Sequence, residues 1–309
     1  TYLLLEEKRT GEINIRNFYI RRVLRIWPLY YLYFILTILT LIVYGLPIEE
    51  TSIFFYVFLM ANVPFILGRT IEFLGHYWSL GVEEQFYSFW PWIIKKSKSI
   101  LKVTAFICIA LVLLKVVLRL ADILTNEGEP NWLYETLHVT RFQCMLIGAI
   151  GAILYFQKSA LFLKVTDNLV AQSISWVVIF LVAINNFHVV SFLDNEIISV
   201  VTVFLIIGQI QKTKRIVNLD TAFFDFIGKI SYGIYVIHPL VIFYLSKAMA
   251  FSNKTNPLNY LLVYLSVLLT TITLAYLSYE FFEKRFLFLK VKYSTIKSSD
   301  TMRHAEQRG

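Results

Sequence analysis

The chain has 309 residues, of which 57% are hydrophobic and only 16% are charged, and its mean hydropathy is +0.63. A water-soluble domain of this length cannot enclose so much apolar surface, so the composition excludes an ordinary soluble enzyme. The net charge of +8 comes from short basic segments between apolar runs, which is typical of a membrane protein and not of a nucleic-acid-binding one. Both cysteines, Cys108 and Cys144, lie inside apolar runs, which argues against a disulfide framework.

Apolar stretches that approach the length of a membrane-spanning helix recur along the chain. The first is expected to begin at Pro28, since a missing N–H costs nothing in the first turn of a helix. The spans are expected at about 28–46, 76–94, 101–120, 140–157, 173–190, 196–210, 231–249 and 259–282. A shorter run, 52–67, is flanked by acidic residues. The sequence therefore predicts an all-α, polytopic transmembrane bundle of about eight spans plus one interfacial or re-entrant helix.

Lysine and arginine gather in alternate connections between these stretches. Of the 29 basic residues, 23 lie in five segments, namely 1–27, 95–102, 158–172, 211–230 and 283–309. The charged residues of the connections between them are mainly acidic, namely Glu49, Glu50, Glu72, Asp122, Glu127, Glu129, Glu135, Asp194 and Glu196. If 52–67 does not cross, the positive-inside rule places all five basic segments, and therefore both ends of this chain, in the cytoplasm.

The most polar of the expected spans contains four candidate functional residues, His76, Ser79, Glu83 and Glu84. In a helix, the first three of them would occupy positions i, i+3 and i+7, which share one face. Ionisable side chains at membrane depth are costly unless they are paired, hydrated or functional. Two interpretations stay open: a catalytic or binding face, or a polar contact between helices in which His76 and Glu83 satisfy each other.

Basic residues near the ends of spans also allow two interpretations each. Arg21, Arg22 and Arg25 either fix the orientation of the first span and contact anionic lipid, or form a clamp for a phosphate-bearing ligand. Lys115 and Arg119 lie one turn apart near the outer end of their span, and Arg141 opens the next. These side chains are expected either to snorkel to the outer surface or to line an outward cavity with His76.

Three features of the later spans concern packing. His238 is a lone histidine in an apolar helix, for which packing is the default interpretation. Pro239 follows it and leaves a backbone carbonyl without its helical partner, which a polar neighbour can satisfy. Gly148 and Ala152 form a small-residue face that predicts close helix packing.

No Cys or His cluster has metal-ligand spacing, so neither a metal nor a cofactor is expected.

Four segments, in this order, resemble the acyltransferase 3 family, the membrane-bound O-acyltransferases of bacterial cell-surface polysaccharides. They are 18–28 (FYIRRVLRIWP), 76–87 (HYWSLGVEEQFY), 140–148, which begins Thr-Arg-Phe, and 231–239 (SYGIYVIHP). The second is the most specific, because the family pattern is H-x-W-S-L-x-V-E-E-Q-F-Y. The resemblance covers residues 1 to about 290. We therefore expect one acyltransferase 3-like domain at 1–285 and a basic cytoplasmic tail at 286–309.

The resemblance implies a multi-pass enzyme of the bacterial inner membrane. It would move an acyl group, with acetyl expected, from cytoplasmic acyl-CoA to a hydroxyl of a cell-surface or exported glycan. The expected partners are therefore acyl-CoA, a glycan or lipid-linked sugar, and the bilayer, with no nucleic acid and no cofactor beyond the co-substrate. The candidate residues are Arg21, Arg22 and Arg25 for acyl-CoA, His76, Ser79, Glu83 and Glu84 for catalysis, and Arg141 and His238 as further candidates.

The chain also departs from the family pattern. Residues 1–5 are expected to be the end of a span that begins upstream, so that the family's first two spans, with an Arg-rich element and a histidine, would precede residue 1. Gln143 stands where relatives often have a carboxylate. If that upstream histidine is the catalytic base, His76 and Glu83 only support it. A transporter or flippase of a lipid-linked sugar, or an inactive fragment, remains the alternative.

Overall fold

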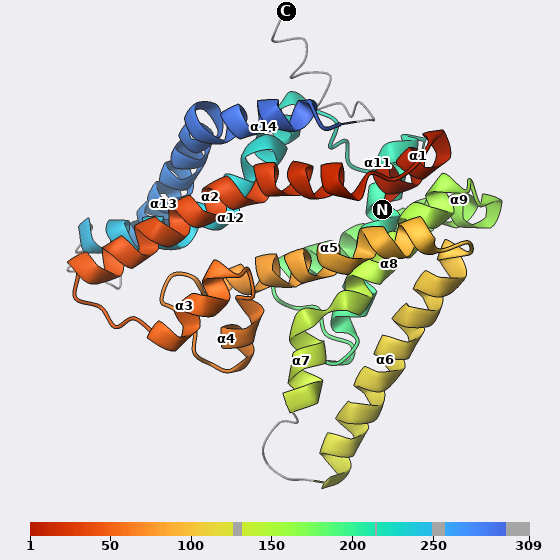
Figure 1. Cartoon of the computed structure of the whole chain (residues 1–309), viewed down its shortest axis with the longest axis horizontal. Helices are drawn as coiled ribbons and strands as arrows, with labels where there is room; N and C mark the ends of the chain where they lie inside the picture. Colours follow the sequence, from red (N-terminus) through yellow and green to blue (C-terminus); the bar gives the residue numbers. More distant parts are fainter. Residues whose placement is uncertain (126–131, 214, 249–256, 295–309) are drawn as a thin grey trace, which may run out of the picture. The chain divides into compact units, whose positions relative to one another are not determined.

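The computed structural model describes residues 1–125, 132–213, 215–248 and 257–294, and all regular structure within these ranges is helical (Figure 1). The predicted all-α class is therefore confirmed. The chain divides into two compact units. The first unit consists of Thr1–Ile13 and Val82–Thr221, and the second consists of Asn14–Gly81 and Ala222–Gly309. Residues 295–309 of the predicted tail at 286–309 lie outside the described residues.

Membrane-length helices account for most of the described chain. Among the described residues, six helices are long and apolar enough to cross a membrane: Ile15–Val43, Ile100–Leu124, Trp132–Phe156, Asp194–Gln211, Ala222–Ala248 and Leu258–Val291. The pair Ala160–Thr166 and Leu169–Ala183, bent by 58°, makes seven if it is one span. The polytopic prediction is thus confirmed, with six or seven candidate spans in place of eight. The remaining predicted span, 76–94, forms helix α5 (Trp78–Lys96), which carries Glu83, Glu84, Lys95 and Lys96 and is not among them.

The segment predicted not to cross the membrane consists of two short helices. These are α3 (Glu50–Val57) and α4 (Asn62–Ile66), with 8 and 5 residues. At about 1.5 Å per residue, neither reaches across a hydrocarbon core about 30 Å thick. Between them the backbone of Leu59 takes a positive φ of 59°, which interrupts the helical path. The segment therefore does not cross as a single helix.

Helix α2 (Ile15–Val43) begins earlier than the sequence predicted. Asn14 caps it, because its side-chain oxygen accepts a hydrogen bond from the backbone N–H of Asn17 at 3.0 Å. No glycine or proline interrupts residues 15–27, so the helix continues through the basic segment and Pro28 lies in its interior. The prediction that this span starts at Pro28 is therefore wrong, since a good N-cap and an uninterrupted helical sequence precede it.

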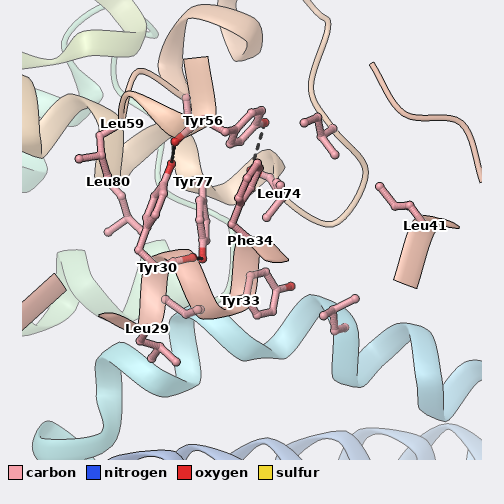
Figure 2. Close-up of a cluster of buried hydrophobic side chains, with 14 residues drawn as sticks. Leu29, Tyr30, Tyr33, Phe34, Leu41, Tyr56, Leu59, Leu74, Tyr77 and Leu80 are labelled. Carbon is pink, nitrogen blue, oxygen red and sulfur yellow. Dashed lines mark hydrogen bonds between the residues drawn. The ribbon is translucent and has the colours of Figure 1, made fainter. Parts of the chain in front are cut away.

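The core of the second unit is rich in tyrosine and is organised by α2 (Figure 2). Buried residues follow α2 at helical spacing: Ile26, Leu29, Tyr30, Tyr33, Phe34, Thr37, Thr40 and Leu41. Tyr30 donates through its hydroxyl to the carbonyl of Tyr56 at 2.8 Å, and Tyr77 donates to the carbonyl of Tyr30 at 3.1 Å (Figure 2). The rings of Tyr30 and Tyr77 lie with centroids 4.4 Å apart. Phenol groups thus bury apolar surface and also satisfy backbone carbonyls.

The C-terminal helices complete the second unit. They are α12 (Ala222–Ala248), α13 (Pro257–Ser278), the π-helical turn η2 (Tyr279–Glu283) and α14 (Lys284–Val291). Gly233 of α12 permits close packing on α13, because a Cβ there would lie 3.1 Å from that of Ala275. Helix α14 packs against α2, and Arg21 donates to the carbonyl of Tyr293 at 2.8 Å.

The first unit is built around α8 (Phe142–Phe156), which packs against α6 (Ile100–Thr125) and α11 (Asp194–Gln211). Its other helices are α1 (Tyr2–Thr10), α7 (Trp132–Thr140), α9 (Ala160–Thr166) and α10 (Leu169–Ala183), in addition to α5 from Val82 onward. The predicted close packing is present on α8, but at a different glycine. A Cβ on Gly151 would collide with Val203 of α11, whereas one on Gly148 would meet nothing within 4 Å.

Candidate functional site

Two histidines from distant parts of the second unit lie together. His76 sits in the 3-10 turn η1 (Gly75–Tyr77) that leads into α5, and His238 lies on α12. Their ring centroids are 5.3 Å apart. The Nε2 atom of His76 is 3.3 Å from the carbonyl oxygen of Val236. Because a carbonyl only accepts, Nε2 carries the proton in a neutral ring and Nδ1 is left with a lone pair.

The orientation of His238 depends on the proline that follows it. Pro239 has no N–H, so the carbonyl of Tyr235, four residues earlier, lacks its usual helical partner. The Nδ1 atom of His238 lies 2.9 Å from that carbonyl oxygen and donates to it. The polar neighbour predicted for this carbonyl is thus His238 itself. In a neutral ring the Nε2 atom of His238 then carries the lone pair.

The side chain of Tyr235 connects the turn around His76 to α12. Its hydroxyl donates to the backbone carbonyl of His76. The same oxygen is 2.6 Å from Oγ of Ser79, and since its only proton is already used, Ser79 is the donor there. Rings of Tyr33, Tyr77 and Tyr235 surround the His76 imidazole at centroid distances of 5.9, 4.9 and 5.2 Å. His76 is therefore held by one hydrogen bond of its ring, one hydrogen bond of its backbone carbonyl, and packing against three tyrosine rings.

Glycine at position 81 fixes the helix that follows His76. A Cβ on Gly81 would lie 2.9 Å from the backbone nitrogen of Ala61 and 3.1 Å from Oδ1 of Asn62. The first of these distances is shorter than real Cβ contacts allow, and the atom is backbone, which cannot move aside easily. The absence of a side chain thus lets the start of α5 rest directly on the connection between α3 and α4.

The three predicted donor-binding arginines lie on the N-terminal half of α2. Arg21 and Arg22 are partly buried and Arg25 is exposed. Arg21 is anchored by the carbonyl of Tyr293, and Arg25 interacts electrostatically with Glu283 of η2. Arg22 and Arg25 are three residues apart and so project from neighbouring turns of one helix.

In the first unit, polar side chains meet where α6, α7, α8 and α11 approach one another. Lys115 is fully buried, and its Nζ lies 2.8 Å from Oε1 of Glu196. Of the two interpretations given for Lys115, snorkelling to the outer surface is therefore wrong, because a carboxylate on another helix satisfies it inside the unit. Arg141 lies between α7 and α8 in a left-handed conformation with φ of 47° and donates through Nε to the carbonyl of His138 at 3.1 Å.

Comparison with known proteins gives the family. The family model described as an acyltransferase domain matches residues 1–280. This chain belongs to the acyltransferase 3 family. It is 27% identical to O-acetyltransferase OatA of Staphylococcus aureus strain MRSA252, with 94% of this chain and 52% of that protein aligned. It is also 27% identical to OatA of strain NCTC 8325, with 91% and 49% aligned. The chain thus spans about half the length of the curated relatives it matches, and no solved structure matches it.

The structure brings together only some of the residues that the acyltransferase 3 resemblance singled out. His76, Ser79 and His238 meet in the second unit, whereas Glu83 and Glu84 lie on the part of α5 that belongs to the first unit. The pairing of His76 with Glu83 stays a prediction. Sequence reasoning missed Tyr235, which holds both Ser79 and His76. A signal for it was present, since it lies four residues before Pro239, within the segment that resembles the family.

Proposed function

We propose that this acyltransferase 3 protein is an integral membrane O-acyltransferase that moves an acyl group, most simply acetyl, from acyl-CoA to a hydroxyl of a cell-surface or exported glycan. Membership of the family supports acyl transfer as the reaction. Relatives that are named O-acetyltransferases support an acetyl group as the group transferred and an oxygen atom as its acceptor. The several candidate membrane spans support the proposal that acyl-CoA and the glycan acceptor react within a membrane-embedded enzyme.

The observation that carries the proposal is the oriented histidine pair. In the proposed step, a lone-pair nitrogen of His76 takes the proton of the acceptor hydroxyl as its oxygen attacks the thioester carbonyl carbon. The new C–O ester bond forms and the C–S bond breaks. The leaving thiolate receives the proton from the imidazolium, so that CoA leaves as a thiol. The carbonyl of Val236 and the hydroxyl of Tyr235 hold His76 for this role.

The proposed donor site is the arginine group on α2. Coenzyme A carries several phosphate charges, and guanidinium groups one turn apart suit such a ligand. Arg22 and Arg25 occupy the positions of the family's Arg-x-x-Arg element, and Arg21 adds a third positive charge. With the basic connections facing the cytoplasm, as the charge distribution predicts, these arginines would meet the cytoplasmic acyl-CoA pool.

The test uses the natural full-length protein, purified and reconstituted into liposomes. Acetyl-CoA labelled in the acetyl group is added with an extract of lipid-linked glycan, and both the free thiol and the label esterified to glycan are measured over time. Acyl transfer predicts that the two appear in equal amounts and only when glycan is present. Movement of glycan across the bilayer with no consumption of thioester would identify a transporter and contradict the proposal.

A further inference from the structure

The last candidate span of the described chain is longer than a bilayer core is thick. It runs from Leu258 to Val291 and has 34 residues, whereas about 20 helical residues cross a hydrocarbon core about 30 Å thick. Its C-terminal part, η2 and α14, carries the charged side chains Glu280, Glu283, Lys284, Arg285 and Lys290. Charged side chains are costly at membrane depth, so the excess length lies at this end, outside the hydrocarbon core.

The packing of α14 sets its level in the membrane. It lies along the N-terminal half of α2 (Figure 1), which is the basic part of that helix. Arg21 of α2 donates to the carbonyl of Tyr293 just after α14, and Arg25 interacts electrostatically with Glu283 just before it. Because this half of α2 is too charged for hydrocarbon, α14 is held at the level of the lipid headgroups.

One face of this C-terminal segment is exposed. From Tyr279 to Ser294, the exposed side chains are Phe281, Arg285, Leu289 and Lys292. They follow one another at intervals of four, four and three residues, which places them on one side of a helix. Phe281 is 67% exposed and Leu289 is 53% exposed. These four residues, the α14 stripe, thus alternate apolar and basic side chains.

The two cations of the α14 stripe differ from their neighbour Lys284, which pairs with Glu280 at 2.9 Å. Within the described ranges, neither Arg285 nor Lys292 belongs to an ion pair. Their charges therefore suit an anion, and phosphate is the anion that guanidinium and ammonium groups commonly bind. A small soluble phosphate compound would leave the apolar members of the stripe in water. A phosphate attached to hydrocarbon chains satisfies both kinds of side chain.

We propose that the α14 stripe is a binding site for an anionic phospholipid. Arg285 and Lys292 bind the headgroup, and the acyl chains pack on Phe281 and Leu289. Basic residues beside apolar ones at the membrane interface are attracted to anionic lipid in this way. Since α14 packs against the arginine-bearing half of α2, the bound lipid also braces that half. The site does not depend on the proposed acyl transfer.

The experiment is native mass spectrometry of the purified natural full-length protein in an uncharged detergent. Dioleoylphosphatidylglycerol and dioleoylphosphatidylcholine, which have the same chains, are titrated separately. One variant combines Arg285→Gln with Lys292→Gln, and a second carries Leu289→Asn. The charge-matched control combines Lys98→Gln with Lys102→Gln, which removes two exposed cations elsewhere. Acetyl-CoA is added in a further arm as a soluble phosphate competitor, and thermal melting establishes that each variant folds.

The wild type is expected to bind phosphatidylglycerol more tightly than phosphatidylcholine. The double variant at positions 285 and 292 is expected to weaken the tightest phosphatidylglycerol site about 25-fold, about fivefold for each cation. Leu289→Asn is expected to weaken it about fivefold, because apolar contact is lost. The lysine control and acetyl-CoA are expected to leave it unchanged.

Three results would overturn the lipid site. Equal affinity of the wild type for the two lipids would show that the anionic headgroup is not recognised. An equal loss in the lysine control would show that general charge, and not the α14 stripe, attracts the lipid. Displacement of phosphatidylglycerol by acetyl-CoA would assign Arg285 and Lys292 to a soluble phosphate ligand. The proposed acyl transfer would stand after any of these results.

Discussion

The imidazole rings of His76 and His238 lie 5.3 Å apart, and each is bound to a backbone carbonyl of α12, those of Val236 and Tyr235. These two carbonyls are neighbours in the chain, at the turn where Pro239 interrupts the helical hydrogen bonds. The proline supplies the acceptor that fixes His238 beside His76.

Pro239→Ala tests that relationship. Alanine restores an N–H that bonds the carbonyl of Tyr235, so His238 loses its exclusive acceptor and its ring is less well fixed. Because an interior proline is unfavourable in a helix, we expect an unchanged or higher melting temperature. Acyl transfer is expected to fall up to about tenfold, which corresponds to one hydrogen bond of about 1.4 kcal/mol. A variant as active as wild type would show that the orientation of His238 has no functional role.

Gly81→Ala is expected to destabilise the protein. Its Cβ would lie 2.9 Å from the backbone nitrogen of Ala61, and overpacking of this kind costs about 1–3 kcal/mol. The matched control is Gly148→Ala, also in a helix, where the new Cβ meets nothing within 4 Å. That control is expected to be neutral or to stabilise by about 0.5–1 kcal/mol, since alanine favours helix. Thermal melting in detergent measures both, and equal melting temperatures would contradict the packing described for Gly81.

The general architecture could be predicted from the sequence because hydropathy is a local property. Runs of apolar residues predicted the long helices, and the short run at 52–67 corresponds to the two short helices α3 and α4. The start of α2 was missed because apolar length was given more weight than the helix signal of Asn14 and the residues after it. Polarity along a chain does not show where a helix begins.

The candidate site was predictable only in part, because its contacts are formed between residues far apart in the chain. Pro239 predicted a backbone carbonyl without its helical partner, and in the structure the side chain of His238 donates to that carbonyl. The proximity of His76 to His238 has no local signal. The same holds for Lys115, because its partner Glu196 lies on another helix and the sequence offered only an outer-surface or an outward-cavity interpretation of its charge.

The predicted orientation is tested with single cysteines at two exposed positions, Ser99→Cys and Asn186→Cys. The positive-inside distribution places residues 95–102 in the cytoplasm and the connection before α11 outside. We expect a membrane-impermeant maleimide to label Asn186→Cys in intact cells and Ser99→Cys only after permeabilisation. The parent protein, with its native Cys108 and Cys144, is the background control. Labelling of both positions from outside would contradict this topology.

Arg22→Ala and Arg25→Ala are expected to weaken acyl-CoA binding, whatever acceptor is supplied. Each loses a charge-assisted contact of about 1.5–3 kcal/mol, which corresponds to about tenfold or more in affinity. Lysine at either position is expected to rescue only partly, because an ammonium group cannot form the planar, two-pronged contact of guanidinium. Equilibrium binding of a labelled acyl-CoA measures the effect. Normal donor affinity in both alanine variants would leave the arginines as orientation signals only.

The most direct measurement compares turnover with donor binding in His76→Ala, using the natural full-length protein. A general base typically contributes about 10²–10⁴-fold to rate without binding the donor. We therefore expect acyl transfer to glycan to fall by about 10²-fold or more, while acyl-CoA affinity stays unchanged and the melting temperature shows a folded protein. Wild-type turnover in a folded His76→Ala variant would contradict the proposed role of the histidine pair.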